Sequence, residues 1–386
     1  MPKNTSSLFS IKLPRIILVS LLSIATNSSY SQGCCSGGSG SPIAGGASQG
    51  VLQDRQMEVA STYQYNSSGN FLTRDKDTAK LFERFFSNYI YSKVAYGVTK
   101  DLTVSVEAGY FLNKTQVGLF DSVLNKSEEI TSSGIADLII FPRYDVINRN
   151  GENKRIELTL GLGYKIPLGK HADSTLVYTD PGTGQQYFTT SPPLVQPTNG
   201  SHDLIMYAFY FRGWPDNNFR LFTNALYIRK GWNSLGEKFG DYASIGLFAG
   251  KTFFEKLGVT LQLKADRIGK LKAAENVDLL AFYNVDTAST GSRKIALVPQ
   301  LSFSHKSLTV FALAEFPLYE YVNGTQVASQ HQITFGLSYR FFTYRSIVPK
   351  SGETVYACSM NCEGGADTKP GKCRICGMDL IEQKAK

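Results

Sequence analysis

Apolar and polar side chains alternate along this chain in segments of 10–14 residues, from about residue 55 to residue 345. Segment 257–266 shows the pattern: one face carries Val259, Leu261 and Leu263, and the other carries Thr260, Gln262, Lys264 and Asp266. A period of two with one apolar face indicates β-strands lying between two different environments. Twelve such strands are predicted, at 55–66, 87–98, 101–112, 134–147, 153–166, 201–213, 218–230, 241–253, 257–269, 294–304, 308–320 and 330–345.

The connections between the predicted strands alternate in length. Five are tight turns, at 99–100, 148–152, 215–217, 254–256 and 305–307. Six are longer loops, at 67–86, 113–133, 167–200, 231–240, 270–293 and 321–329. An even number of strands joined in this way is typical of outer-membrane barrels, whose short turns face the periplasm. We therefore predict an all-β fold, a transmembrane antiparallel up-and-down β-barrel of about 12 strands over residues 55–345, with both chain termini in the periplasm.

A soluble β-sandwich or lipocalin-type barrel also alternates, but it would turn its apolar face inward. Here the face opposite the apolar one carries single charges, namely Glu107, Glu157, Lys165, Lys264, Asp266 and Arg340. In a membrane barrel these would face a watery lumen, so we expect solvated groups with no selectivity role. Strands 218–230 and 308–320 alternate poorly because of Phe222, Leu226, Phe311 and Leu313. Their local register therefore stays open.

Composition agrees with this class of protein. The chain of 386 residues is 42% hydrophobic and 12% aromatic and holds 35 glycines, which favours strands over helices. No apolar run reaches the ~18 residues that a membrane-spanning helix needs. The net charge of +8 is spread along the chain without a dense basic run, so nucleic acid is not an expected partner. The expected surroundings are outer-membrane lipid.

The N-terminus reads as an export signal. Three basic residues precede the apolar stretch 16–25, and small residues follow at Ser29 and Ser31. We predict a signal peptide over 1–31 and an outer-membrane location in a Gram-negative bacterium. A lipid anchor on Cys34 is the alternative, but residues 31–33 lack the usual Leu. Residues 32–54 form a Gly/Ser-rich periplasmic segment with a cysteine pair, predicted to be a flexible tether.

Several barrel segments resemble known outer-membrane proteins. Residues 334–341 (TFGLSYRF) resemble the signal in the last strand with which such barrels are handed to their assembly machinery. Residues 134–144, 160–169, 199–204 and 221–227 resemble the outer-membrane family associated with the meta-pathway of phenol degradation. That resemblance implies a pore-like outer-membrane protein but does not identify its substrate.

After a predicted linker, 346–355, the alternation gives way to a cysteine-rich segment, 356–382. Its cysteines are spaced C-x3-C-x10-C-x2-C, at Cys358, Cys362, Cys373 and Cys376. Two thiols two residues apart can hold one ion, while the following Gly377 permits a tight turn. A segment this short has no real hydrophobic core and needs such a staple to fold.

This segment resembles the heavy-metal-binding domain of copper and silver efflux adaptors and of metal-pumping ATPases, whose pattern is Y-x-C-P-M-H-P followed by P-G-x-C-P-x-C-G-M-x-L. The matching residues are Tyr356, Cys358, Met360, Pro370, Gly371, Cys373, Cys376, Gly377, Met378 and Leu380. Asn361 stands where the family has His, and Cys362 where it has Pro. The resemblance implies a metal site, and a fourth thiolate in place of an imidazole would favour soft ions such as Cu(I), Ag(I), Zn(II) or Cd(II).

Alternatives to this metal site stay open. The four thiols can instead form disulfides, since the periplasm is oxidising, or hold a purely structural zinc. Met360 and Met378 are further candidate ligands for Cu(I), although Met378 fits a packing role better. Cys34 and Cys35 are a second candidate metal point, with a disulfide or free thiols as the plainer interpretation.

The leading functional hypothesis is heavy-metal binding, transport or resistance, with a soft metal ion as ligand and a periplasmic efflux or metal-carrier partner. The alternative is a passive channel for small hydrophobic or aromatic compounds with a structural tail. An enzyme is not expected. The four histidines, His171, His202, His305 and His331, show no recognised spacing to a serine, and no phosphate-binding glycine loop appears.

Overall fold

The structure, a computed structural model, describes residues 50–122, 126–150, 155–254, 256–279, 286–305, 307–329, 331–343, 354–358, 367, 369–371 and 379–384. The predicted signal peptide 1–31, and most of the predicted segments 32–54 and 346–355, lie outside these residues. Within the described part of the chain, no helix has the length and apolar character to cross a bilayer.

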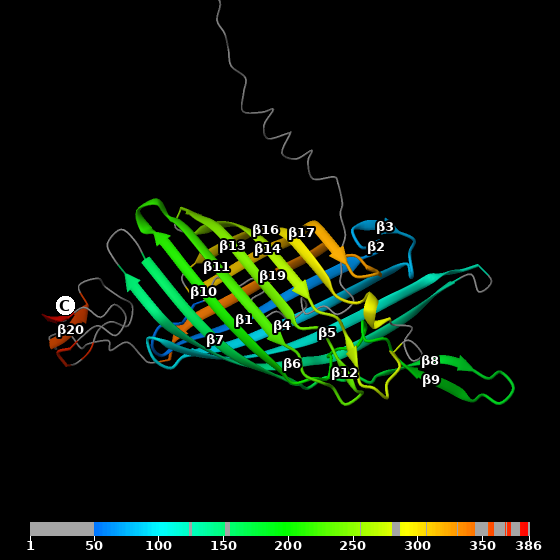
Figure 1. Cartoon of the computed structure of the whole chain (residues 1–386). Helices are drawn as coiled ribbons and strands as arrows, with labels where there is room; N and C mark the ends of the chain where they lie inside the picture. Colours follow the sequence, from blue (N-terminus) through cyan, green and yellow to red (C-terminus); the bar gives the residue numbers. More distant parts are fainter. Residues whose placement is uncertain are drawn as a thin grey trace, which may run out of the picture.

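Twelve of the described strands close into one antiparallel barrel (Figure 1). They are β1 (Gln56–Ser68), β4 (Arg84–Gly97), β5 (Leu102–Asp121), β6 (Lys126–Asn150), β7 (Arg155–Pro167), β10 (Asp203–Trp214), β11 (Phe219–Arg229), β13 (Tyr242–Phe253), β14 (Leu257–Ile268), β16 (Ser292–His305), β17 (Leu308–Val322) and β19 (His331–Phe342). Each pairs with the next barrel strand along the chain, and β1 pairs with β19 to close the ring. The predicted all-β, up-and-down architecture is confirmed, and each predicted segment overlaps one barrel strand.

The two faces of the barrel wall differ as the sequence pattern requires. On β14 the outward side chains of Leu257, Val259, Leu261 and Leu263 are 38–49% exposed. Between them, Thr260, Gln262, Lys264 and Asp266 point inward and are less exposed. Outward apolar residues continue around the ring on β1, β7, β13, β16 and β19. Such a band, with polar groups inside, is what a β-barrel in lipid presents.

The ends of the barrel differ in their connections. One end carries the tight turns between β4 and β5, β6 and β7, β10 and β11, β13 and β14, and β16 and β17. We call this the turn end, and the opposite one the loop end. Small sheets cover the loop end: β2 (Phe71–Thr73) with β3 (Lys76–Thr78) and β18 (Thr325–Val327), β8 (Ser174–Thr179) with β9 (Gln186–Thr190), and β12 (Glu237–Lys238) with β15 (Lys272–Ala273).

The expectation of a long loop over 113–133 was wrong. Instead, β5 and β6 continue as a paired hairpin that extends past the other barrel strands (Figure 1). Thr115 pairs with Thr131 on one face and Gln116 with Ile130 on the other, so neither face of this extension is uniformly apolar. Because it lies beyond the apolar band, the alternation that marks the other strands is lost there.

The first described residues bend into the turn-end mouth. The Leu52 amide donates to Thr103 Oγ1 at 2.7 Å, and Leu52 is only 2% exposed. A Cβ added to Gly50 would lie 1.7 Å from Glu157 Oε1, so Gly50 lies directly against this carboxylate. Thr103 and Glu157 both face the lumen, and the segment 50–54 therefore narrows the mouth from within.

Candidate functional site

Residues 191–201, which follow β9, fold inward over the loop-end opening; we call them the inner segment. Leu194 and Val195 pack against Phe85, a lumen-facing residue of β4. The backbone oxygen of Gln196 accepts a hydrogen bond from Lys114 Nζ at 2.8 Å. The inner segment thus covers the wall formed by β4 and β5 at this end.

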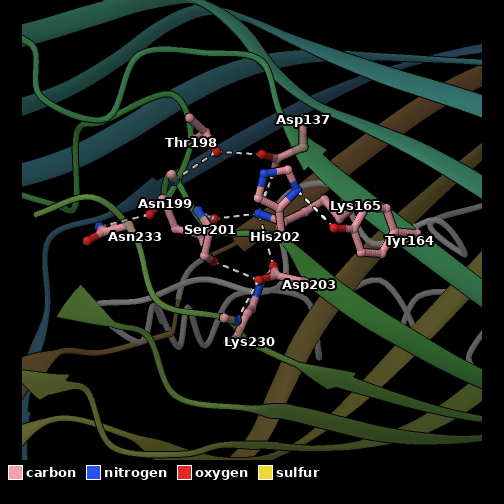
Figure 2. A network of polar contacts seen from close by, with 12 residues as sticks. Asp137, Tyr164, Lys165, Thr198, Asn199, Ser201, His202, Asp203, Lys230 and Asn233 are labelled. Carbon is pink, nitrogen blue, oxygen red and sulfur yellow. Dashed lines mark hydrogen bonds and ion pairs between the residues drawn. The ribbon is translucent and has the colours of Figure 1, made fainter. Parts of the chain in front are cut away.

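A charged network fixes the far end of the inner segment (Figure 2). The ammonium group of Lys165 lies 3.2 Å from Asp137 Oδ2 and 3.0 Å from Asp203 Oδ2. It also donates to the side chain of Asn199, while Thr198 donates to Asp137. Asp203 is shared with Lys230 at 3.0 Å. The two cations and two carboxylates balance, so the network has no net charge. We call this network the clasp.

The loop between β11 and β13 joins this network through Asn233. Its side-chain amide donates to the Asn199 carbonyl at 3.0 Å and to Glu237 Oε2 at 2.8 Å. Burial raises the pKa of the Glu237 carboxyl, which Asn233 partly offsets. The inner segment is thereby tied to the outer loops as well as to the wall.

A second balanced network lies on the opposite wall. Lys264 contacts Asp266 at 2.9 Å and Glu315 at 3.0 Å, and Lys294 pairs with Glu315 as well. At the turn end, Glu58 pairs with both Lys93 and Arg340. Because opposite charges alternate in these groups, they form no single-sign ring of the kind that selects ions.

The charges singled out in the sequence do face the lumen, but the expectation that each stands singly in water was wrong. Lys165, Lys264, Asp266 and Arg340 are in the ion pairs above. Glu157 pairs with Arg155 at 2.9 Å, and Glu107 accepts a hydrogen bond from the Tyr91 hydroxyl. The partners come from the same strand, the next strand or the one after it in the ring, where inward side chains lie close enough to pair.

The inner wall of β6, β10, β11 and β13 is apolar and aromatic. Its buried members are Ile139, Phe141, Ile205, Tyr207, Phe209, Leu226, Ile228 and Tyr242. Phe222 stacks on Phe248 with ring centroids 4.3 Å apart and planes at 13°. Phe222 and Leu226, which interrupt the sequence alternation, thus point into the lumen, and the same holds for Phe311 and Leu313 on β17. We call this surface the aromatic wall.

The C-terminal hairpin, β20 (Thr354–Cys358) and β21 (Leu380–Lys384), brings distant parts of the cysteine-rich segment together. Cys358 is directly opposite Leu380 in the register. The Leu380 amide also donates to the Gly371 carbonyl at 2.8 Å, and Tyr356 forms a bridge with Asp367. Gly371 and Leu380, the described residues that flank Cys373 and Cys376 in the sequence, are therefore held together beside Cys358.

Of the sequence-predicted metal ligands, only the backbone of Cys358 is described. Cys362, Cys373, Cys376, Met360, Met378, Cys34 and Cys35 lie outside the described residues. In the part of the chain that is described, no group of three or more His, Cys, Asp and Glu side chains is arranged to hold a metal ion. The four-thiol site stays a prediction.

The histidines occupy separate places. His171 contacts Ser234 Oγ at 2.8 Å in the outer loops, and His202 contacts the Tyr164 hydroxyl at 3.2 Å on the outer rim. His305 ends β16 at the turn end, and His331 begins β19 at the loop end. Sequence reasoning missed the inner segment and the aromatic wall. Three prolines within 191–200 and the broken alternation of 218–230 were the available signals.

Comparison with known proteins shows what each of the two parts is similar to. Residues 355–383 match the heavy metal binding domain. The barrel is similar to a COG4313 outer membrane channel from Pseudomonas putida F1, with TM-score 0.56 and 10% identity over 77% of this chain and 99% of that one. This likeness shows a common fold. The KdgM porin (TM-score 0.35, 8% identity, 73% and 99% of the two chains) and the translocator domain of autotransporter NalP from Neisseria meningitidis (0.39, 12%, 75% and 90%) also match. No curated protein matches.

The chain is thus a closed β-barrel with the fold of an outer-membrane channel, and its residues 355–383 match a heavy metal binding domain. The predicted resemblances of the barrel and of the tail are both confirmed.

Proposed function

We propose that this protein captures a soft heavy-metal ion at its C-terminal domain, on the periplasmic side of the outer membrane, and so serves metal transport or resistance. The observation that carries the proposal is the match of residues 355–383 to the heavy metal binding domain. The register of Cys358 with Leu380, and the hydrogen bond from Leu380 to Gly371, support it because they hold the residues that flank the second cysteine pair in the sequence beside Cys358.

Covalent reach makes the four-thiol site feasible. Each residue spans at most about 3.6 Å, so Cys373 lies within about 7 Å of Gly371, and Cys376 within about 14 Å of Leu380. Cys362 is four residues beyond Cys358. Four thiolates without the imidazole of the family pattern favour Cu(I), Ag(I) or Zn(II) over hard cations. The metal is the cargo of the domain in this proposal.

The topology supports a periplasmic position. Outer-membrane barrels keep their short turns on the periplasmic side and their long loops outside. Here β1 begins and β19 ends at the turn end, where the Thr343 amide donates to the Arg55 carbonyl at 3.0 Å. The ten residues 344–353 that lead to β20 reach about 36 Å at most. A captured ion would stay near the turn-end mouth, accessible to a periplasmic carrier or efflux partner.

Metal uptake by the whole protein tests this proposal. The metal-free, reduced chain is titrated separately with Cu(I), Ag(I) and Zn(II), and stoichiometry is read by native mass spectrometry. We expect one soft ion per chain, lost in the variant with Cys373→Ser and Cys376→Ser. The variant with Cys34→Ser and Cys35→Ser is the matched control and should keep that ion. Equal uptake by all three proteins, or none by any, contradicts the proposal.

A second candidate function is passage of small aromatic or hydrophobic compounds through the lumen. The aromatic wall favours it, because stacked rings such as Phe222 and Phe248 offer apolar contact to such solutes. Liposome swelling with phenol would report the flux. Flux unchanged by deletion of residues 346–386, together with no metal uptake by the whole chain, would favour this function over metal handling. In either case we propose a binding or transport role without enzymatic catalysis.

A further inference from the structure

A basic groove lies on the outer surface at the loop end, beside the small sheet β12–β15. Its volume is about 350 Å³, and its polar lining includes Lys238, Arg267, Lys270 and Lys272. One carboxylate, Asp241, also lines it. Asp241 is already occupied, since it accepts hydrogen bonds from the Tyr227 hydroxyl at 3.0 Å and from the Lys230 amide at 2.9 Å. The groove therefore has a strong excess of positive charge.

Like charges face one another twice here: once between two residues that line the groove, and once between a lining residue and its partner on the next strand. Lys238 on β12 is directly opposite Lys272 on β15. Arg267 on β14 is directly opposite Arg293 on β16, and both are exposed on the outward face. Among the described residues, no carboxylate lies within ion-pair distance of these four cations. Directly opposed like charges destabilise a strand pair, so the free protein carries repulsion here that nothing in its described part relieves.

The groove sits where the apolar band ends. Along β14 the outward positions run Leu261, Leu263, Ala265 and then Arg267, the first charge after the lipid-facing residues. On β13 the next outward residue beyond Ile245 towards the loop end is Ala243, which lines the groove. This level of a membrane barrel meets lipid headgroups, and here the headgroups are those of the leaflet on the loop side.

We propose that this groove binds the phosphate groups of an anionic glycolipid of the outer leaflet, with the acyl chains lying against the neighbouring apolar strands. A phosphate placed between the opposed cations turns their repulsion into charge-assisted hydrogen bonds, and the guanidinium groups of Arg267 and Arg293 suit bidentate contact with its oxygens. The tail and its metal are not involved. The proposal assumes that the loop end faces outward, as argued above.

The test uses the whole protein in detergent and native mass spectrometry with three probes: diphosphoryl lipid A, the same lipid without phosphates, and inorganic phosphate. We expect one diphosphoryl lipid A to bind per chain and the phosphate-free lipid to bind weakly. The variant with Arg267→Gln and Lys272→Gln should bind lipid A at least about tenfold more weakly, because it loses two charged contacts. The control, Arg212→Gln with Lys251→Gln, removes two exposed outward cations at the turn end and should bind normally.

Thermal unfolding separates this role from a merely structural one. Without lipid A, Arg267→Gln should raise the melting temperature, because it removes a repulsive pair; with lipid A it should melt below the parent protein. If the double variant fails to fold, Arg293→Gln alone should show the same reversal. Equal loss in the groove variant and the control, equal binding of both lipids, or competition by inorganic phosphate at concentrations similar to lipid A would overturn the proposal.

Discussion

Lys165 and Asp203 are direct partners across the strand pair β7–β10, and the ammonium nitrogen of Lys165 lies 3.0 Å from Asp203 Oδ2. The same ammonium group holds Asn199 of the inner segment. One cross-strand ion pair thus joins the barrel wall to the segment that narrows the loop-end opening. Because Lys230 shares Asp203, removing Lys165 leaves this carboxylate with one cation instead of two.

Lys165→Met should loosen the inner segment while leaving the barrel closed. We expect a loss of about 2 kcal/mol in the free energy of unfolding, less than for a fully orphaned buried charge, because Lys230 stays with Asp203 and the partly exposed Asp137 keeps its hydrogen bond from Thr198. Urea unfolding in lipid vesicles measures the stability, and amide hydrogen exchange at 191–201 measures the loosening. Lys170→Met removes an exposed pair with Asp173 and should cost less than about 0.5 kcal/mol. Equal effects of the two variants would show that the clasp does not hold the inner segment in place.

Phe222→Ala tests the aromatic wall. Removal of the ring stacked on Phe248 should lower the affinity for aromatic solutes, with a loss of about 1 kcal/mol for the missing ring pair. It should also raise ion conductance in planar bilayers, because the lumen widens. The control is Phe316→Ala, whose ring faces outward and is 44% exposed, and which should alter neither property. Unchanged solute block in Phe222→Ala would show that the wall does not contact the solute.

Gly97→Ala should dislodge the segment that bends into the turn-end mouth. A Cβ at residue 97 would lie 1.9 Å from the Gln53 carbonyl oxygen, too close for any real contact, so residues 50–54 have to shift. We expect a larger single-channel conductance and faster protease cleavage near residue 53. Gly182→Ala, in an exposed turn where the nearest atom would be 3.4 Å away, should change neither. A wild-type conductance in Gly97→Ala would mean that this segment does not restrict the mouth.

Metal removal should affect the tail without affecting the barrel. A domain this small gains much of its folding free energy from its metal, whereas the barrel strands close on one another. After chelation under reducing conditions, we expect trypsin to cleave within 355–383 faster, while the thermal transition of the barrel stays unchanged. A shift of the barrel transition on chelation would indicate a metal site within the barrel itself.

Sequence reasoning succeeded wherever a strand crosses between lipid and lumen, because that position imposes strict alternation, as on β14. Prediction from the sequence was less successful where a strand leaves the lipid, or where the lumen beside it is apolar. The extension of β5 and β6 lies beyond the apolar band, so its strands lack the alternation and were predicted to be a loop. Phe222 and Leu226 face a part of the lumen that is apolar, so in the sequence they interrupt the alternation of apolar and polar residues. The pairing of Lys165 with Asp203 depends on which strands become neighbours and in which register, and single-residue charges do not reveal this.

The tail was easier to recognise than to place. The matching pattern of Tyr356, Cys358 and Met360, followed by Pro-Gly and C-x2-C-G-M, is a local property of the sequence, and its resemblance to the heavy metal binding domain is confirmed. By contrast, the contact of Leu380 with both Cys358 and Gly371 involves backbone groups without any distinctive side chain. Such backbone contacts cannot be predicted from the residue types in the segment.

The seam between β1 and β19 has a consequence for biogenesis. Glu58 and Arg340, which meet across it, are 282 positions apart in the chain. During synthesis and transit, β1 keeps an unsatisfied edge until almost the entire cylinder-forming sequence has been made, and such edges invite intermolecular association. We therefore expect the nascent polypeptide to depend on an escorting chaperone, and truncation before residue 331 to yield material that aggregates or is degraded.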